Sequence, residues 1–294
     1  MASAAPFEGF ASRPSRRART REELVLRALL YLVVAAGAVA FALPFYWMVR
    51  SAVMPPWQVW LYPPEWIPAG LHFENFLTPF AVFPFARWFA NTAVVALATA
   101  VLTVATGAMV GFSFARLRFP LRDVLFVVLL STMMLPDQVR LVPTYLLFVK
   151  LEWVNTFLPL VVPNGLGPAF YVFLMRQFFM TIPAELDDAA YIDGCSPFGV
   201  FWRIALPLSL PAAGVAAIYS VTYSWNDFLH PLLYLQKLEL YTLALGLRLF
   251  QGQLATQIEA MMAAALMSAL PTVIIFFLAQ RYFVQGIVIT GLKG

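Results

Sequence analysis

The sequence predicts an all-α membrane protein whose chain crosses the bilayer six times. Of its 294 residues, 62% are hydrophobic and 12% are charged, and the mean hydropathy is +0.79. A soluble domain is about 45–50% apolar and about 25% charged. One soluble core cannot bury this excess of apolar residues, so we expect most of it to face lipid. Long runs without a charged residue lead to the same prediction.

The first predicted span covers residues 28–49, which are 22 positions without a charge. That length crosses about 30 Å of hydrocarbon at about 1.5 Å per residue. It is too long for the core of a cleaved signal peptide. The preceding residues 1–23 carry several arginines among Pro, Ser and Ala, and we expect a flexible, basic, cytosolic segment. A nucleic-acid-binding arm is the alternative for this segment.

The other spans belong with the first to one transmembrane domain, residues 24–294. Residues 50–87 are rich in Pro, Trp and Tyr, which suits an extracytoplasmic loop at the membrane interface. The remaining spans are predicted at residues 88–115, 121–136, 153–178, 208–230 and 260–281. Prolines and glycines inside the run 153–178 predict a bent or broken helix.

The third span is short, and polar residues follow it from Asp137 to Arg140. Irregular polar backbone at membrane depth persists only where it lines a wet cavity or packs on protein. We favour a short span 121–136 followed by a partly re-entrant segment up to residue 152. A span that simply ends early is the alternative.

The distribution of Lys and Arg predicts which ends of the spans are cytosolic. With the N-terminus in the cytosol, six of the 19 cations lie outside, at Arg50, Arg87, Arg140, Lys150, Lys237 and Arg248. The other 13 lie inside. This bias places both termini and the segment 181–207 in the cytosol.

Residues 181–207 are the longest water-compatible segment between two apolar spans, and they read as two short helices with a bend. Acids in the first turn, at Glu185, Asp187 and Asp188, favour the first helix dipole. Its residues Leu186, Ala189, Ala190 and Asp193 share one mostly small face. Gly194 can take a positive φ and end this helix.

The second short helix has its own start and stop signals. Ser196 and Pro197 predict an N-cap and a first helical residue. Phe198, Phe201, Trp202 and Ala205 form an apolar stripe, and we expect Pro207 to end the helix. A plain amphipathic loop would show these features too.

The spacing in this segment resembles the "EAA" loop of ABC-importer permeases. An acid precedes Ala189 and Ala190, Gly194 follows after three residues, and Ile204, Leu206 and Pro207 come after nine more. Asp188 stands where that family usually has Glu. The resemblance implies a coupling helix that docks on a cytosolic ATPase. The implied coupling residues are Glu185, Asp188, Ala189, Ala190, Asp193, Gly194, Ile204, Leu206 and Pro207.

Catalytic and metal-binding patterns are missing from the sequence. The nearest match to a phosphate-binding loop runs from Gly286 to Lys293, with the lysine one place late and no Ser or Thr after it. The single cysteine, Cys195, excludes an internal disulfide, and His72 and His230 lack a ligand-like spacing. We therefore expect no cofactor, no metal and no enzymatic activity, and we expect ATP hydrolysis on a partner.

A candidate solute path lies near the outer end of the fifth span. Ionisable residues at membrane depth are functional by default, which singles out Asp227. Amides and carboxylates bind sugar hydroxyls and aromatic faces stack on sugar rings, so Tyr223, Asn226, Asp227 and, from the second span, Asn91 are the candidates. The alternative is that Asp227 only caps a helix.

Residues 224–232 resemble the carbohydrate branch of ABC permeases, the maltose-transporter permease group. Met262 with the two following alanines, and the segment from Gln280 to Gly294, are similar to the same branch. The tail around Thr290 departs from the usual Ala-Val before Lys, which leaves the subfamily open.

The resemblance implies a sugar importer in a bacterial or archaeal cytoplasmic membrane that works by alternating access. It implies a second permease chain, two ATP-binding subunits and an extracytoplasmic solute-binding protein, with no nucleic acid. A permease for an amino acid, peptide or other non-sugar solute and a secondary transporter are the alternatives.

Overall fold

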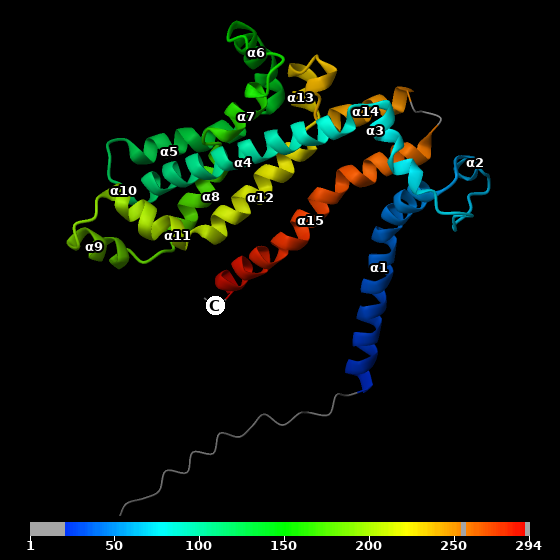
Figure 1. Ribbon diagram of the computed structural model, residues 1–294. Helices are drawn as coiled ribbons and strands as arrows, with labels where there is room; N and C mark the ends of the chain where they lie inside the picture. The colour runs from blue at the N-terminus through cyan, green and yellow to red at the C-terminus, as the bar shows by residue number, and fades with distance from the viewer. Residues whose placement is uncertain (1–20, 254–256, 292–294) are drawn as a thin grey trace, which may run out of the picture. The chain divides into compact units, whose positions relative to one another are not determined.

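The secondary structure is helical, without a strand, in residues 21–253 and 257–291, which the computed structural model describes (Figure 1). The α-helices are α1 (Arg21–Val53), α2 (Pro56–Val59), α3 (Thr78–Val82), α4 (Phe85–Arg116), α5 (Arg122–Ser131), α6 (Asp137–Lys150), α7 (Leu158–Gly165), α8 (Ala169–Phe179), α9 (Glu185–Ile192), α10 (Pro197–Val200), α11 (Leu206–Leu208), α12 (Leu210–Asn226), α13 (Leu229–Tyr234), α14 (Leu243–Gln253) and α15 (Ile258–Gly291). Short 3-10 turns are η1 (Phe73–Phe76), η2 (Thr132–Met134) and η4 (Leu238–Leu240), and η3 (Phe201–Ala205) is a π-helical turn.

The chain divides into two units, residues 1–47 and 48–294. The described part of the first unit is the beginning of α1, whose apolar residues are spread around the whole helix. A helix that is apolar on every side is suited to lipid surroundings. Of the predicted flexible segment 1–23, residues 21–23 begin α1 and the rest lies outside the described residues.

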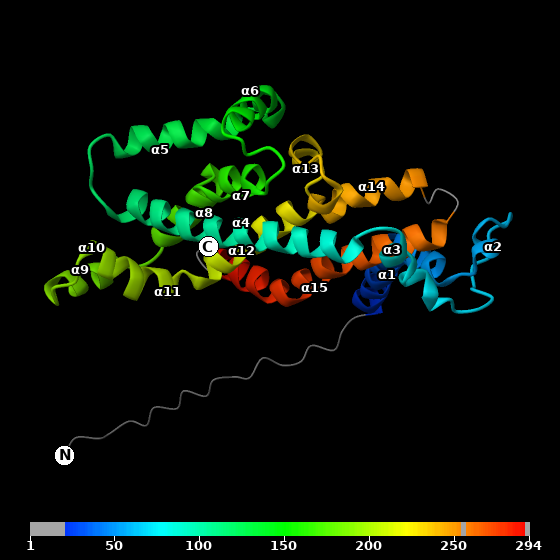
Figure 2. The same ribbon diagram turned by 45° about the horizontal axis from the view of Figure 1, so that its top comes forward.

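Helix α4 is the centre of the second unit, and it packs against α7, α8 and α12 (Figures 1 and 2). Two glycines spaced four apart, Gly107 and Gly111, let the backbones of α4 and α8 approach closely. A Cβ atom on Gly111 would lie 2.9 Å from Met175 Cβ and 3.0 Å from Arg176 N. Small residues at this spacing are a usual means of close helix contact in membranes.

The span predicted at 153–178 is broken, as expected, into α7 and α8 by residues 166–168. A break inside a membrane leaves backbone groups that must find partners. The hydroxyl of Thr106 on α4 supplies them: it donates to Gly165 O at 2.7 Å and accepts from Gly167 N at 2.9 Å. This threonine stabilises the break between the two half-helices.

Four described helical segments are long and apolar enough to span a membrane: Val25–Val53, Phe85–Arg116, Leu158–Phe179 and Ile258–Leu278. Two bent pairs add up to two more, residues 122–134 with 137–150 at 99° and residues 197–208 with 210–226 at 76°. The predicted six spans are thus matched when each bent pair counts as one. The choice between a re-entrant segment and an early end after residue 136 stays open.

Two predicted boundaries were wrong. The helical turns of the 181–207 segment do not end at Pro207, which lies within α11, and the bend follows at Ser209. Pro207 directly follows the π-helical turn η3, and such a turn together with a proline is a usual cause of a helix kink. The fifth span ends at Asn226 and not at residue 230, because Asp227 leaves the helical conformation and a separate short helix, α13, follows.

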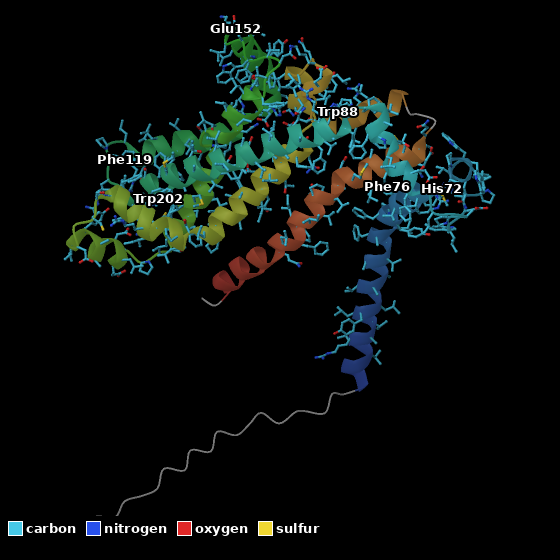
Figure 3. All side chains as sticks on the ribbon, in the orientation of Figure 1. His72, Phe76, Trp88, Phe119, Glu152 and Trp202 are labelled. Atoms are coloured by element: carbon cyan, nitrogen blue, oxygen red, sulfur yellow. The ribbon has the colours of Figure 1, made fainter. Side chains whose placement is uncertain are left out.

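The predicted loop at residues 50–87 is ordered around buried polar side chains. The Gln58 side chain donates to the Ile67 carbonyl at 3.0 Å and accepts from Ala69 N at 2.9 Å. Asn75 donates to the carbonyls of Ala52 and Met54. These bonds hold a short helix, α2, and the turn that contains His72 and Phe76 (Figure 3).

Candidate functional site

The segment 181–207, here called the coupling loop, has the local structure that its sequence predicts. Helix α9 ends where Gly194 adopts a φ of +82°. The Ser196 hydroxyl accepts a hydrogen bond from Gly199 N at 3.2 Å, and Pro197 is the first residue of α10. A left-handed glycine followed by a capped helix start gives the loop a defined bend.

Most of the nine residues that the sequence singled out for coupling are accessible. Six of them are exposed: Glu185, Asp188, Ala189, Asp193, Gly194 and Pro207. Ile204 and Leu206 are half-buried and pack against the hydrophobic core. The prediction was wrong for Ala190. It does not share the exposed face of Ala189, because it is buried in the hydrophobic core of the chain.

Sequence reasoning missed the acid of α9 that faces inward. Asp187 is buried, and its Oδ2 lies 3.2 Å from Nε of Arg116 at the end of α4, where both side chains are shielded, 9% and 12% exposed. Burial raises the pKa of the Asp187 carboxyl, and the Arg116 guanidinium opposes that rise. The signal was the pairing of Asp187 with Ala190 at i and i+3, which places both on one helix face.

Exposed apolar side chains on the coupling loop were also missed. Ile192 is 86% exposed, and Tyr191 is exposed beside it. Phe198 and Trp202, two members of the predicted apolar stripe, are both exposed, and their rings are stacked with centroids 6.4 Å apart. Figure 3 shows Trp202 at the same end of the molecule as Phe119. Phe198 and Trp202 also line an apolar pocket with residues of α4 such as Val101 and Val104, so lipid or a partner chain can cover them.

Below this surface lies a hydrophobic cluster that joins the coupling loop to α4, α8 and α12. Its large members include Phe112, Met175, Phe179 and Phe201. The Phe112 ring contacts the rings of both Phe179 and Phe201, with centroids 5.7 Å and 5.3 Å away. The coupling loop therefore rests on the ends of the spans through close-packed side chains.

A small polar cavity of about 150 Å³ lies within the second unit, among α6, α7, α12 and α13. Figures 1 and 2 show α6, α7 and α13 close together there. Its lining combines charged groups, hydroxyls and aromatic rings. The lining residues are Asp137, Arg140, Leu141, Thr144, Phe148, Pro159, Pro163, Asn164, Tyr223, His230 and Tyr234.

The charges at this cavity are paired. Arg140 bonds to Asp137 one turn away on α6. His230 Nδ1 lies 3.0 Å from Oδ2 of Asp227, and Asp227 Oδ1 accepts from His230 N at 3.2 Å. Asp227 thus accepts a hydrogen bond from a backbone N–H of the first turn of α13, from one residue before the N-cap position, Phe228.

The structure brings some of the four predicted solute-path residues together and separates others. Tyr223 lines the cavity, and Asp227 reaches it through His230. Asn226 is exposed and donates to Thr222 O of its own helix. Asn91 donates to the carbonyls of Glu239 and Tyr241, so its amide joins α4 to the turn before α14 and does not line this cavity.

Comparison with known proteins gives the family. Residues 104–289, more than half of the chain, match the family described as the binding-protein-dependent transport system inner membrane component. The chain belongs to this family. Members of this family are transport permeases, so the all-helical fold with its multi-pass membrane helices is that of a permease subunit.

Relatives of this permease are identical to it at about a third of the aligned positions. The probable ABC transporter permease YurM of Bacillus subtilis is 34% identical over 87% of this chain and 85% of its own. The arabinooligosaccharide transport permease AraQ of Bacillus subtilis is 36% identical over 71% and 74%. The sn-glycerol-3-phosphate transport permease UgpE of Pectobacterium atrosepticum is 38% identical over 70% and 73%.

A solved structure confirms the fold of the permease. A chain of a bacterial ABC transporter that imports the acidic polysaccharide alginate superposes with a TM-score of 0.78. The match covers 90% of this chain and 99% of that one at 20% sequence identity. At this identity the likeness concerns the fold alone.

Proposed function

We propose that this permease is one subunit of an ATP-driven importer that moves a carbohydrate or a related polyol across the cytoplasmic membrane by alternating access. The observation that carries this proposal is the identity of 36% and 38% with permeases named for arabinooligosaccharides and sn-glycerol-3-phosphate. The polar cavity supports it, because hydroxyls, an amide and aromatic rings together suit a polyhydroxylated solute.

The coupling loop is the proposed contact with a cytosolic ATPase. Its exposed acids, Glu185 and Asp188, provide charge for basic partner side chains. Its exposed Ile192 and Trp202 provide apolar surface that a partner groove would cover. The two carboxylates then give orientation and the apolar groups give affinity.

The partners in this proposal are a second permease chain, two ATP-binding subunits and a solute-binding protein outside the membrane. A structural relative of this chain, with a TM-score of 0.64, comes from an alginate transporter in complex with its periplasmic protein. We place both termini and the coupling loop in the cytosol, following the excess of Lys and Arg on that side. The transmembrane domain is residues 24–294.

The function is tested by purifying the tagged permease from its native membrane with its partners and reconstituting the complex into vesicles. We expect uptake of a neutral sugar that requires ATP on the coupling-loop side and the solute-binding protein on the other. Other solutes supplied on the side of the solute-binding protein, including sn-glycerol-3-phosphate and amino acids, define the solute class. Ion-gradient-driven uptake by the isolated chain, without ATP, would contradict the proposal.

The solute path is tested at Asp227 and Tyr223. Asp227→Asn keeps an oxygen acceptor for the first turn of α13 and removes the charge beside His230, and Tyr223→Phe removes one cavity hydroxyl. Losing one hydrogen bond to a bound solute raises its apparent KM about tenfold. The measurement is uptake against solute concentration, with Asn226→Ala as the control outside the cavity. Equal KM values for all four proteins would reject this path.

A further inference from the structure

Arg116, at the end of α4, contacts the coupling loop at two points. Its Nε lies 3.2 Å from Asp187 Oδ2, and its terminal NH2 group donates to the carbonyl of Ile182 at 2.5 Å. Ile182 precedes α9 and Asp187 lies inside it. One guanidinium therefore joins the end of a span both to the approach of the coupling loop and to its first helix.

The three acids in the first turn of α9 have different surroundings. Glu185 and Asp188 are exposed, whereas Asp187 is buried against α4. The exposed pair is free to meet a partner protein, and the buried carboxylate faces the chain itself. Asp187 and Asp188 therefore face opposite environments, the chain's interior and the surface, because successive helical residues point about 100° apart.

A charged pair of this kind fixes position more strictly than an apolar contact. Hydrophobic association is non-directional, so a helix that rests only on apolar side chains can slide. The planar guanidinium donates in a fixed direction to the Ile182 carbonyl, and its charge is held within 3.2 Å of the Asp187 carboxylate as an ion pair. The surroundings of Arg116 and Asp187 are shielded from water, which strengthens their attraction.

The far side of α4 continues this connection into a second span. Close to Arg116, α4 crosses α8 at Gly111, where its backbone lies against Met175 and Arg176. Arg176 Nε donates to the carbonyl of Phe114 on α4 at 3.4 Å, and its guanidinium lies over the Phe126 ring of α5. A displacement of the end of α4 would therefore reach α8 and α5 as well.

We propose that Arg116 and Asp187 are positioning residues that transmit movement of the coupling loop to the membrane spans. This inference rests on the proposed function of the loop as the ATPase contact. When the ATPase moves α9, the ion pair of Asp187 with Arg116, which also donates to the Ile182 carbonyl, makes α4 follow. Without this ion pair, the ATPase still binds the exposed face of α9, but part of its movement is lost within the loop.

The experiment measures solute moved per ATP hydrolysed by the complete reconstituted complex. Arg116→Gln and Asp187→Asn remove the charge pair and leave the exposed docking face of α9 unchanged. Arg118→Gln and Asp123→Asn are the matched controls, because they remove an exposed cation and an exposed acid nearby. We expect the first two to lower the transport-to-ATP ratio about tenfold, within the range of coupling changes by single residues, and the controls to keep it.

Two further variants separate transmission from folding. Arg116→Lys keeps the charge but lacks the planar fork, so it should assemble and give an intermediate ratio. The reversed pair, Arg116→Asp with Asp187→Arg, restores opposite charges and should recover part of the ratio lost in the single variants.

Each outcome decides the inference. An unchanged ratio in assembled Arg116→Gln and Asp187→Asn complexes overturns it. If those variants fail to assemble, an Arg116→Lys complex with the full parental ratio overturns it, and one with a reduced ratio supports it. Failure of the proposed function is recognised separately, because the parent complex would then show no ATP-dependent uptake.

Discussion

At the scale of single residues, the turn between α9 and α10 depends on the backbone of Gly194. Its φ of +82° lies in the left-handed region, which residues other than glycine, asparagine and aspartate rarely adopt. A Cβ atom there would meet nothing within 4 Å in this chain. The backbone conformation, and not a contact inside the chain, is therefore the reason for glycine.

This predicts different effects for two substitutions at this position. Gly194→Val places a β-branched side chain at positive φ, which costs about 1–2 kcal/mol or more and displaces α9. Gly194→Asn tolerates the conformation and should keep most of the ATP-dependent uptake that Gly194→Val loses. Uptake by the reconstituted complex is the measurement. If Gly194→Asn is as defective as Gly194→Val while both assemble, then close approach of a partner is what excludes a side chain.

At the scale of elements, the close crossing of α4 and α8 depends on Gly107 and Gly111. Their four-residue spacing is a sequence signal for close helix packing in membranes. In the structure a Cβ on Gly111 would come within 3.1 Å of backbone atoms of α8, at Arg176 N and Val172 O. Helical backbone cannot shift by a few tenths of an ångström without disturbing its neighbours.

We therefore expect Gly111→Ala to lower the stability of the permease by about 1–3 kcal/mol through overpacking. Gly214→Ala in α12 is the matched control, since a Cβ there meets nothing within 4 Å. Alanine in a helix is favoured over glycine by about 1 kcal/mol, so the control should keep or raise the melting temperature. Thermal unfolding of both detergent-purified variants tests this. A Gly111→Ala protein as stable as the control would show that α8 can move away.

At the scale of the whole molecule, the coupling interpretation requires that the 181–207 segment and the 50–87 loop lie on opposite sides of the membrane. The chain allows a direct test because Cys195 is its single cysteine. In a Cys195→Ser background, Ile192→Cys and Tyr62→Cys each place one thiol at a position that is 86% and 94% exposed.

A membrane-impermeant maleimide added to intact cells should label Tyr62→Cys and leave Ile192→Cys unlabelled. Opening the membrane and removing the bound ATPase should then make both thiols reactive. Labelling of Ile192→Cys in intact cells would place the coupling loop outside, where no ATPase could reach it, and would contradict the topology that the charge distribution predicts.

Features that depend on neighbouring residues were predictable from the sequence. The apolar runs identify the spans, because crossing about 30 Å of hydrocarbon requires about 20 consecutive apolar residues. The breaks and bends of the coupling loop follow from Gly194, the Ser196 cap and Pro197, whose conformational preferences act within a few residues. These local rules gave the fold class and located the candidate coupling surface.

Features that depend on distant residues were decided by the tertiary structure alone. Whether Asp187 or Asp188 faces inward is set by Arg116, which lies two predicted spans earlier in the sequence. Asn91 is polar in an apolar run, yet its amide bonds to carbonyls about 150 positions away and not to a solute path. A polar side chain within a span must find a partner, but the sequence does not say which one, because that depends on which helices come to lie side by side.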